Sequence, residues 1–261
     1  MLRYIFILFF ILISFCLTLH TSRSIGMSGS NVALTKSQFA LIDNPAYIAQ
    51  SSFKFHKETL DLNQTYYRSY EQWFMNMGKL AYGEINQHYK DENFYKINLI
   101  GYGEVIDRKA QWGVVYQNIQ HKQDGKLYNT WAMNLGVAAL ISARPLTLIG
   151  LKFGNFYKDP SVPEQIDLPL NITVGLAHEL SSWAIWKNSI VYQRKKANNI
   201  EYSSGMKLDF EKFLVLLGLG SSRYSLGIEI STLIGELSYS VSVPYQLEEQ
   251  VQYSIAYTYL R

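Results

Sequence analysis

The stretch LPLNITVGLAHEL, residues 168–180, decides the fold, because apolar side chains alternate along it with small or polar ones. One face carries Leu168, Leu170, Ile172, Val174 and Leu176, and the other carries Pro169, Asn171, Thr173, Gly175, Ala177 and Glu179. Successive side chains on a β-strand point to opposite faces of the sheet. The stretch therefore predicts a strand with one apolar and one polar face.

The same alternation recurs along most of the chain. It is clearest near the C-terminus, in residues 224–231, 237–243 and 251–259. Segments of lower contrast are residues 94–107, 110–120, 130–142, 146–157, 183–194, 200–210 and 213–222, and we expect two further strands between Ser52 and Asn86. The breaks between segments hold turn-forming residues, as in residues 122–125. This spacing predicts consecutive hairpins in an antiparallel, all-β meander.

The composition fits a membrane barrel better than a soluble domain. Of the 261 residues, 48% are hydrophobic and only 17% are charged, against roughly 25% charged residues in ordinary soluble domains. The mean hydropathy of −0.06 is too low for a bundle of membrane helices, but it is usual where lipid-facing and lumen-facing residues alternate. The net charge of +3 is scattered and too small to indicate nucleic-acid binding.

The direction of the apolar faces separates two fold classes. In a soluble sandwich these faces point inward, whereas in a transmembrane β-barrel they point to lipid. Three features favour lipid: polar faces poor in Lys and Glu, an N-terminal export signal, and aromatic residues near strand ends, namely Trp112, Trp131, Trp183, Tyr224 and Tyr245. The last strand has alternating Tyr but ends in Leu260-Arg261, where many outer-membrane proteins end on an aromatic residue. We predict a closed barrel of 12–14 strands, with fourteen favoured, since each crossing takes about 9–11 residues.

The N-terminus indicates export. Arg3 precedes an apolar run over residues 4–19, the pattern of a secretory signal peptide. We expect residues 1–24 to be this peptide, with cleavage between about residues 16 and 24; a membrane anchor that is never cut is the alternative. Phe15 argues against a lipoprotein site at Cys16. Together with the barrel pattern, the peptide predicts location in the bacterial outer membrane.

No catalytic, cofactor-binding or metal-binding residues are predicted, so we expect a protein that is not an enzyme. The chain lacks a Gly-x-Ser-x-Gly elbow, a His-Glu-x-x-His helix and a phosphate-binding loop. The five histidines show no metal-ligand spacing, and Cys16 is the single cysteine. A functional His178-Glu179 pair at a strand end, or a Ser/His hydrolase pair in the barrel wall, are the alternatives. Glycines at 101, 103, 218 and 220 are interpreted as strand glycines.

Two N-terminal segments carry a family resemblance. SRSIGMSGSNVAL, residues 22–34, is followed by FALIDNPAYIA, residues 39–49. Together they resemble the N-terminal stretch of the PorV/PorQ family, within the wider FadL-like group of outer-membrane barrels. Ser28 replaces a glycine of that pattern, and KSQ at residues 36–38 replaces an acidic spacer. Residues 151–155, 168–170, 175–177 and 205 onward also match, so the resemblance covers most of the mature chain through short, degenerate motifs.

The resemblance implies a fourteen-stranded barrel, residues 52–261, whose N-terminal segment, residues 25–51, folds inward as a short helical plug. Its most specific motif is Asn44-Pro45-Ala46. Pro45 is suited to the first position of a helix, where its missing N–H is not needed. We expect Phe39 and Tyr47 to anchor the plug.

Three roles are candidates for the barrel, and the resemblance implies the first two. We favour the first, in which a PorV/PorQ-like protein would be accessory to type IX-like protein secretion or surface attachment, with secretion-machinery proteins or exported cargo as partners beside outer-membrane lipid, because Leu168-Pro169 and the Asn155 loop fit that branch better. A FadL-like protein would pass small hydrophobic molecules. The third role is a structural envelope barrel with a sealed lumen. The chain is short for this family, which implies that large extracellular loops are absent.

Overall fold

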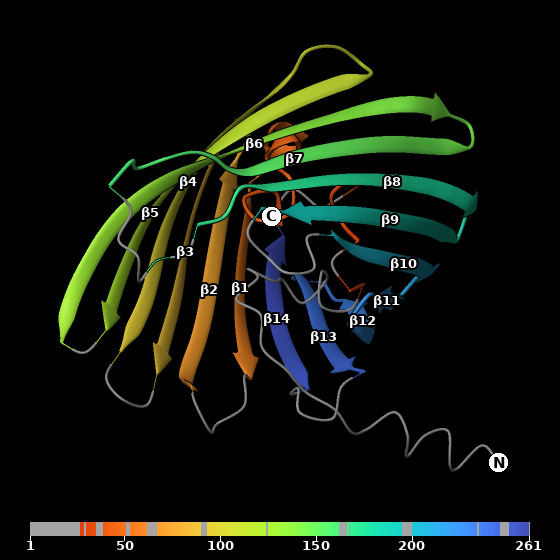
Figure 1. The fold of residues 1–261 in the computed structure, drawn as a ribbon. Helices are drawn as coiled ribbons and strands as arrows, with labels where there is room; N and C mark the ends of the chain where they lie inside the picture. Colours follow the sequence, from red (N-terminus) through yellow and green to blue (C-terminus); the bar gives the residue numbers. More distant parts are fainter. Residues whose placement is uncertain are drawn as a thin grey trace.

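A computed structural model describes residues 27–28, 30–34, 39–50, 53–61, 67–89, 93–123, 125–161, 166, 168–194, 200–233, 235–245 and 251–260. The chain forms a closed antiparallel β-barrel of fourteen strands, in which each strand pairs with its neighbours in sequence and β1 pairs with β14 (Figure 1). The predicted fold class and strand number are thereby confirmed. The predicted signal peptide, residues 1–24, lies outside the described residues.

The strands differ in length. Their bounds are β1 Lys54–Asp61, β2 Tyr67–Met77, β3 Leu80–Tyr89, β4 Phe94–Val105, β5 Ala110–Gln123, β6 Lys126–Ala143, β7 Leu146–Lys158, β8 Asn171–Ser181, β9 Ala184–Gln193, β10 Ile200–Phe210, β11 Phe213–Gly220, β12 Arg223–Ser231, β13 Gly235–Pro244 and β14 Gln252–Leu260. A six-residue 3-10 helix, η2 Pro45–Gln50, precedes them. Among the described residues, no helix has the length and apolarity needed to cross a membrane.

The outer surface of the barrel is largely apolar. On β12, Leu226 and Ile228 are 40% and 39% exposed, whereas the flanking Ser225 and Glu229 are buried. The same arrangement holds on β11, β13 and β14. The soluble-sandwich alternative is therefore wrong, because its apolar faces would point inward. A closed barrel with an apolar outside satisfies its backbone hydrogen bonds in hydrocarbon.

The region between Ser52 and Asn86 is where the sequence prediction fails. Three strands begin in it, not the expected two. The β2–β3 turn has only two residues, and Gly78 takes the positive φ of 73° that this turn requires. Phe74 and Ile85 are buried inside the barrel, while Glu84 lies on the outer face, so the usual polar and apolar faces are mixed. This mixture removes the sequence contrast on which the strand prediction depends.

The two ends of the barrel differ. At the end where β1 begins and β14 stops, the connections between strands span two to four residues, as in residues 78–79 and 106–109. At the opposite end the β7–β8 connection spans residues 159–170. Bacterial membrane barrels have short periplasmic turns and longer extracellular loops. We call the first the termini end and the second the loop end.

Candidate functional site: the occupied barrel interior

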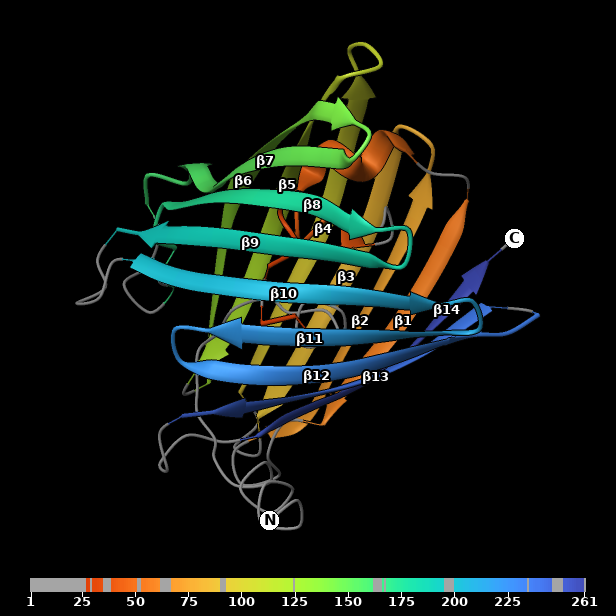
Figure 2. The ribbon, with the colours of Figure 1, turned by 90° about the vertical axis from the view of Figure 1, so that its right-hand side faces the viewer.

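The described part of the N-terminal chain lies inside the barrel. We call residues 27–28, 30–34 and 39–50 the inner segment; most of its side chains are buried. Met27 contacts β10 and β11, whereas η2 contacts β4, β5 and β6. Figure 2 shows η2 between the wall made by β7–β13 and the wall made by β1–β6. The inner segment therefore crosses the lumen from one wall to the other.

Inward-facing glycines mark its path along the wall. A Cβ added to any of them would lie within 3.1 Å of an atom of the inner segment; they are Gly83, Gly101, Gly103, Gly113, Gly136, Gly150, Gly175, Gly205 and Gly218. A Cβ on Gly113 would overlap the carbonyl oxygen of Pro45, and one on Gly150 would overlap that of Val32. Glycine within a strand commonly marks such close approach of another backbone. We call these nine residues the glycine path.

Gly220 does not belong to the glycine path. The nearest atoms to a Cβ at this position lie at 3.4–3.6 Å, which is ordinary contact. Glycines 101, 103 and 218 are strand glycines, as predicted, and the structure adds their physical reason, namely contact with the inner segment.

Two lysines on the wall, the buried Lys187 and the half-buried Lys152, bind the backbone of the inner segment. Lys187 on β9 donates to the carbonyl oxygen of Leu34 at 2.6 Å and to Oδ1 of Asn31 at 3.1 Å. Lys152 on β7 donates to the carbonyl oxygen of Ile42. Carbonyl oxygens inside a barrel need donors, because buried polar groups without partners are costly. The lysines thus serve as donors for the irregular backbone of the inner segment.

Asn44 connects three parts of the interior. Its Nδ2 donates to the carbonyl oxygen of Val32 at 2.7 Å and to that of Val137 on β6 at 3.3 Å, while its Oδ1 accepts from the backbone N–H of Ala46 at 3.1 Å. The predicted residues Pro45 and Ala46 follow as the first turn of η2, and Ala46 is fully buried. The Asn44-Pro45-Ala46 motif thus joins two stretches of the inner segment to the wall.

The two aromatic residues predicted as anchors are also buried in the interior. The ring of Phe39 meets that of His56 edge to face, with centroids 4.8 Å apart. The hydroxyl of Tyr47 donates to the carbonyl oxygen of Ala33. All five site residues predicted from the sequence, Phe39, Asn44, Pro45, Ala46 and Tyr47, lie in the barrel interior.

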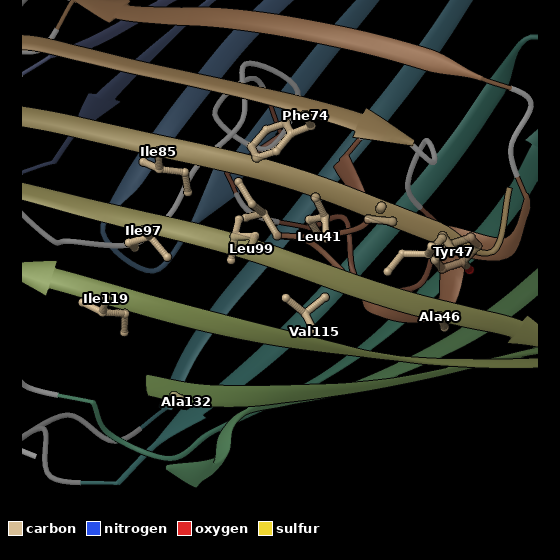
Figure 3. Close-up of a cluster of buried hydrophobic side chains, with 14 of the residues drawn as sticks. Leu41, Ala46, Tyr47, Phe74, Ile85, Ile97, Leu99, Val115, Ile119 and Ala132 are labelled. Carbon is tan, nitrogen blue, oxygen red and sulfur yellow. The ribbon is translucent and has the colours of Figure 1, made fainter. Parts of the chain in front are cut away.

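One half of the inner wall carries a cluster of apolar side chains, interspersed with buried polar residues such as Gln117 and Asn134. Leu41, Tyr47 and Ile48 of the inner segment pack against side chains from β2 to β6 (Figure 3). These wall residues are Phe74, Ala81, Ile85, Ile97, Leu99, Val115, Ile119, Ala132 and Ala138. The opposite half, on β12–β14, is lined by small polar residues such as Ser225, Ser240 and Ser254. The expectation of a lumen lined throughout by small and polar residues is therefore wrong for β2–β6.

The β7–β8 connection contributes to this apolar half. Ile166 and Leu168 are buried in the same cluster, and Lys158 donates to the carbonyl oxygen of Leu168 at 2.7 Å. Asn155 holds the connection further along by donating to the carbonyl oxygen of Pro169 at 3.0 Å. β8 begins only at Asn171, so the prediction that Leu168 starts a lipid-facing strand is wrong.

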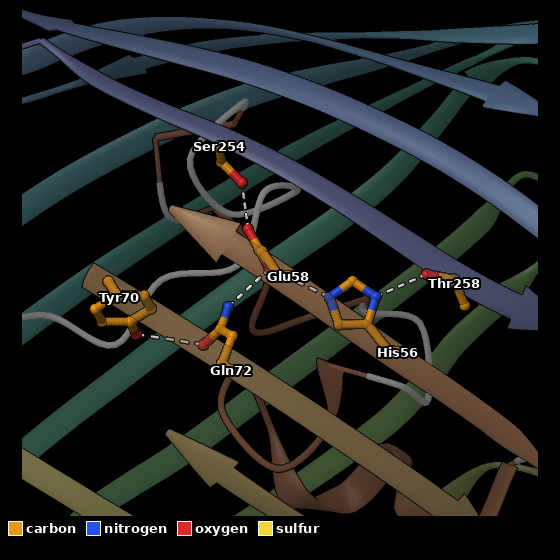
Figure 4. Close-up of polar contacts among 6 residues, drawn as sticks. All are labelled: His56, Glu58, Tyr70, Gln72, Ser254 and Thr258. Atoms are coloured by element: carbon orange, nitrogen blue, oxygen red, sulfur yellow. Dashed lines mark hydrogen bonds and ion pairs between the residues drawn. The ribbon is translucent and has the colours of Figure 1, made fainter. Parts of the chain in front are cut away.

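A buried polar network lies beside the seam between β1 and β14 (Figure 4). Glu58 accepts hydrogen bonds from the hydroxyl of Ser254 and from Nε2 of Gln72, the latter at 2.7 Å. His56 lies between Glu58, at 3.2 Å from its Nε2, and the hydroxyl of Thr258, at 2.7 Å from its Nδ1. Tyr70 extends the network through Gln72. The sequence analysis did not predict this network. A signal was present, because His56 and Glu58 are two residues apart and therefore lie on the same face of the strand, opposite to Lys57.

The network has the hydroxyl–imidazole–carboxylate sequence of groups that the hydrolase alternative requires. His56 and Glu58 are at most 1% exposed, and Thr258 is 3% exposed. Phe39 covers the imidazole, and the hydrogen bonds of Glu58 link β1 to β2 and β14. In this conformation the groups stabilise the closed wall and are not open to a substrate.

The other candidate pair, His178 and Glu179, makes hydrogen bonds between two neighbouring strands. Nδ1 of His178 lies 2.9 Å from the hydroxyl of Thr147, and Glu179 accepts from the backbone N–H of Leu146 at 2.9 Å. Both contacts join β7 to β8 at the termini end. Within the described ranges, no three His, Cys, Asp or Glu side chains lie together as metal ligands would.

Comparison with solved structures finds the same architecture in known proteins. The toluene transporter TodX of Pseudomonas putida superposes with a TM-score of 0.67 at 11% identity, over 94% of this chain and 98% of that chain. A FadL homologue of Pseudomonas aeruginosa superposes with a TM-score of 0.62 at 9% identity, over 94% and 99%. The chain has the fold of the FadL-like outer-membrane barrels. No protein-family model and no curated protein sequence matches it. The narrower PorV/PorQ resemblance stays a prediction.

Proposed function

We propose that the protein is a bacterial outer-membrane barrel that passes small hydrophobic molecules, with the inner segment as its plug. The apolar cluster on the inner wall of β2–β6 carries this proposal. Water-filled porin channels have polar interiors, whereas an apolar wall lowers the free energy of a hydrophobic solute. TodX, which shares the fold, is described as a toluene transporter.

The plug has to move for anything to pass. Its attachments are of two kinds: hydrogen bonds from Lys152, Lys187 and Asn44, and apolar packing of Phe39 and Tyr47. A hydrogen bond to a charged group contributes about 1.5–3 kcal/mol, and truncation of a buried aromatic residue costs about 3–5 kcal/mol. The two kinds of attachment therefore stabilise the closed state on a similar scale.

Deletion of residues 30–50 tests the plug. The intact protein should conduct little or nothing in planar bilayers, and the deletion variant should conduct more. Heat-modifiable migration on a gel would show that the variant still forms a barrel. Uptake of toluene into proteoliposomes, measured for both proteins, tests the solute class. Equal conductance of the two forms would mean that the segment does not block the lumen and is better interpreted as a periplasmic docking arm.

A second candidate function is a PorV/PorQ-like role in type IX-like secretion or surface attachment. It is supported by the motifs in residues 22–34 and 39–49 and by the filled interior, which leaves the barrel free to act as a platform for other proteins. Deleting the gene and measuring surface-attached proteins tests it. Loss of surface proteins with normal toluene uptake would favour secretion, and the opposite result would favour passage of hydrophobic molecules.

A further inference from the structure

The outer face of β1–β5 carries polar residues at positions where β11–β14 carry apolar ones. Their side chains lie on the outer face, because intervening residues such as Gly83 and Ile85 are buried inside. Six of them form what we call the polar stripe: Lys57, Glu71, Glu84, Lys96, Asn98 and Asn118.

Apart from Lys96, the third residue of β4, the polar stripe lies toward the middle of the strands rather than at their ends. β3 has ten residues, which is the length that one tilted strand needs to cross a membrane, and Glu84 is its fifth residue. Glu71 is the fifth of the eleven residues of β2. On the opposite wall, mid-strand positions are held by exposed apolar residues, as at Leu226 and Tyr239. The stripe therefore lies at the depth of the hydrocarbon.

Contacts within the stripe satisfy only part of its hydrogen-bonding capacity. Lys96 Nζ lies 2.9 Å from Oε2 of Glu84, and their side chains remain 35% and 18% exposed. Asn98 accepts from the hydroxyl of Tyr82 at 3.5 Å, although its amide also carries two donors. Lys57 is exposed. Hydrocarbon offers such groups no partner, and ionisable groups facing it are costly.

We propose that the polar stripe is the surface through which two copies of this chain associate within the membrane. The stripe complements itself. Asn98 and Asn118 are register partners at its β4–β5 side, and an amide, being both donor and acceptor, can pair with the same amide across a two-fold axis. Both charge signs are present along the stripe, whereas a surface that recognises a partner of one charge would carry mainly the opposite charge.

This inference rests on the barrel lying in a membrane, but it does not depend on what passes through the lumen. The test uses single cysteines in a Cys16→Ser background of the full chain. Asn118→Cys places a thiol on the stripe, and Leu226→Cys places its control on the apolar outer face of β12. Treating outer-membrane preparations with a short bis-maleimide should give a product of twice the monomer mass for Asn118→Cys and none for Leu226→Cys.

Light scattering of the protein in nanodiscs gives an independent measurement. The unmodified protein should have the mass of two copies, and Asn98→Leu/Asn118→Leu should have that of one copy while still migrating heat-modifiably. A monomeric unmodified protein would overturn the inference, as would a cross-linked product of another mass. A third result would also overturn the inference. If the double variant had the same mass as the unmodified protein and resisted denaturant better in lipid, the stripe would face lipid and not a second copy. Toluene uptake is measured separately, so its absence would count against the proposed function alone.

Discussion

Gly136 on β6 lies directly against the side-chain amide of Asn44, so that a Cβ at position 136 would overlap Asn44 Oδ1. The next residue of the strand, Val137, accepts a hydrogen bond from Nδ2 of the same asparagine. The strand thus provides both the space and one acceptor for Asn44. This contact fixes where the inner segment meets the apolar half of the wall.

Adding a single methyl group at this contact should loosen the inner segment. Gly136→Ala forces Asn44 or the strand to shift, and overpacking of this kind costs about 1–3 kcal/mol. We expect a folded barrel in which a protease cleaves residues 39–50 faster than in the unmodified protein. Gly220→Ala, whose Cβ would meet only ordinary contacts, is the control. Equal cleavage of the two variants would show that the contact does not hold the segment.

Replacing Lys187 should release the inner segment near Leu34. Lys187→Met keeps the length of the side chain but removes the donor for two oxygens, and hydrogen bonds to charged groups contribute about 1.5–3 kcal/mol. The expected result is higher conductance in planar bilayers and a lower denaturant midpoint in lipid vesicles. Lys126→Met, at an exposed strand end, should change neither. Unchanged conductance in Lys187→Met would argue that the segment is held elsewhere.

The orientation of β12 predicts unequal costs for a new charge on one strand. Ile228 lies on the outer face, and Ile228→Arg should destabilise the barrel by about 2–4 kcal/mol near the membrane midplane. Ser231→Arg, at the exposed end of the same strand, should cost less. Refolding titrations into lipid vesicles give both values. A larger cost at Ser231 would contradict the outward orientation of the apolar face.

Removal of the Glu58 carboxylate should weaken the β1–β14 seam. Glu58→Leu removes the hydrogen bonds that the carboxylate accepts from Gln72 and Ser254, and the loss of a partner costs a buried polar group about 1–3 kcal/mol. Glu58→Gln retains one acceptor oxygen and should lose less stability. Ser254→Ala combined with Glu58→Leu should cost less than the sum of the single changes, since the two groups interact. Additive costs would show that the hydrogen bond contributes nothing to the seam.

Much of the wall could be predicted from the sequence, because one face of most strands meets lipid. β10 was predicted with the bounds Ile200–Phe210 that the structure shows. β1–β3 could not be resolved, since Phe74 and Ile85 point inward while Glu71 and Glu84 point outward. Alternation identifies two faces only when their polarity differs, and on these strands both faces are mixed.

The interior could be predicted only in part. Phe39, Asn44 and Tyr47 were chosen from a motif, and they lie in the lumen. The wall residues that bind the inner segment were not predicted. Lys187, for example, donates a hydrogen bond to Asn31, 156 residues away in the sequence. A strand pattern indicates which residues face inward, but it does not show which strands oppose one another across the lumen.

The seam between β1 and β14 constrains the order in which the chain assembles. Lys54 pairs with Leu260, so the wall closes only when the last strand has been made. The inner segment is synthesised before any strand, yet Met27 rests on Gly205 and Gly218, which arrive late in translation. The inner segment therefore cannot make these contacts until β10 and β11 are present, although it is joined directly to β1. Pairings between such distant residues are slow to form, so closure of the seam around an already seated segment should be the last and slowest step of biogenesis.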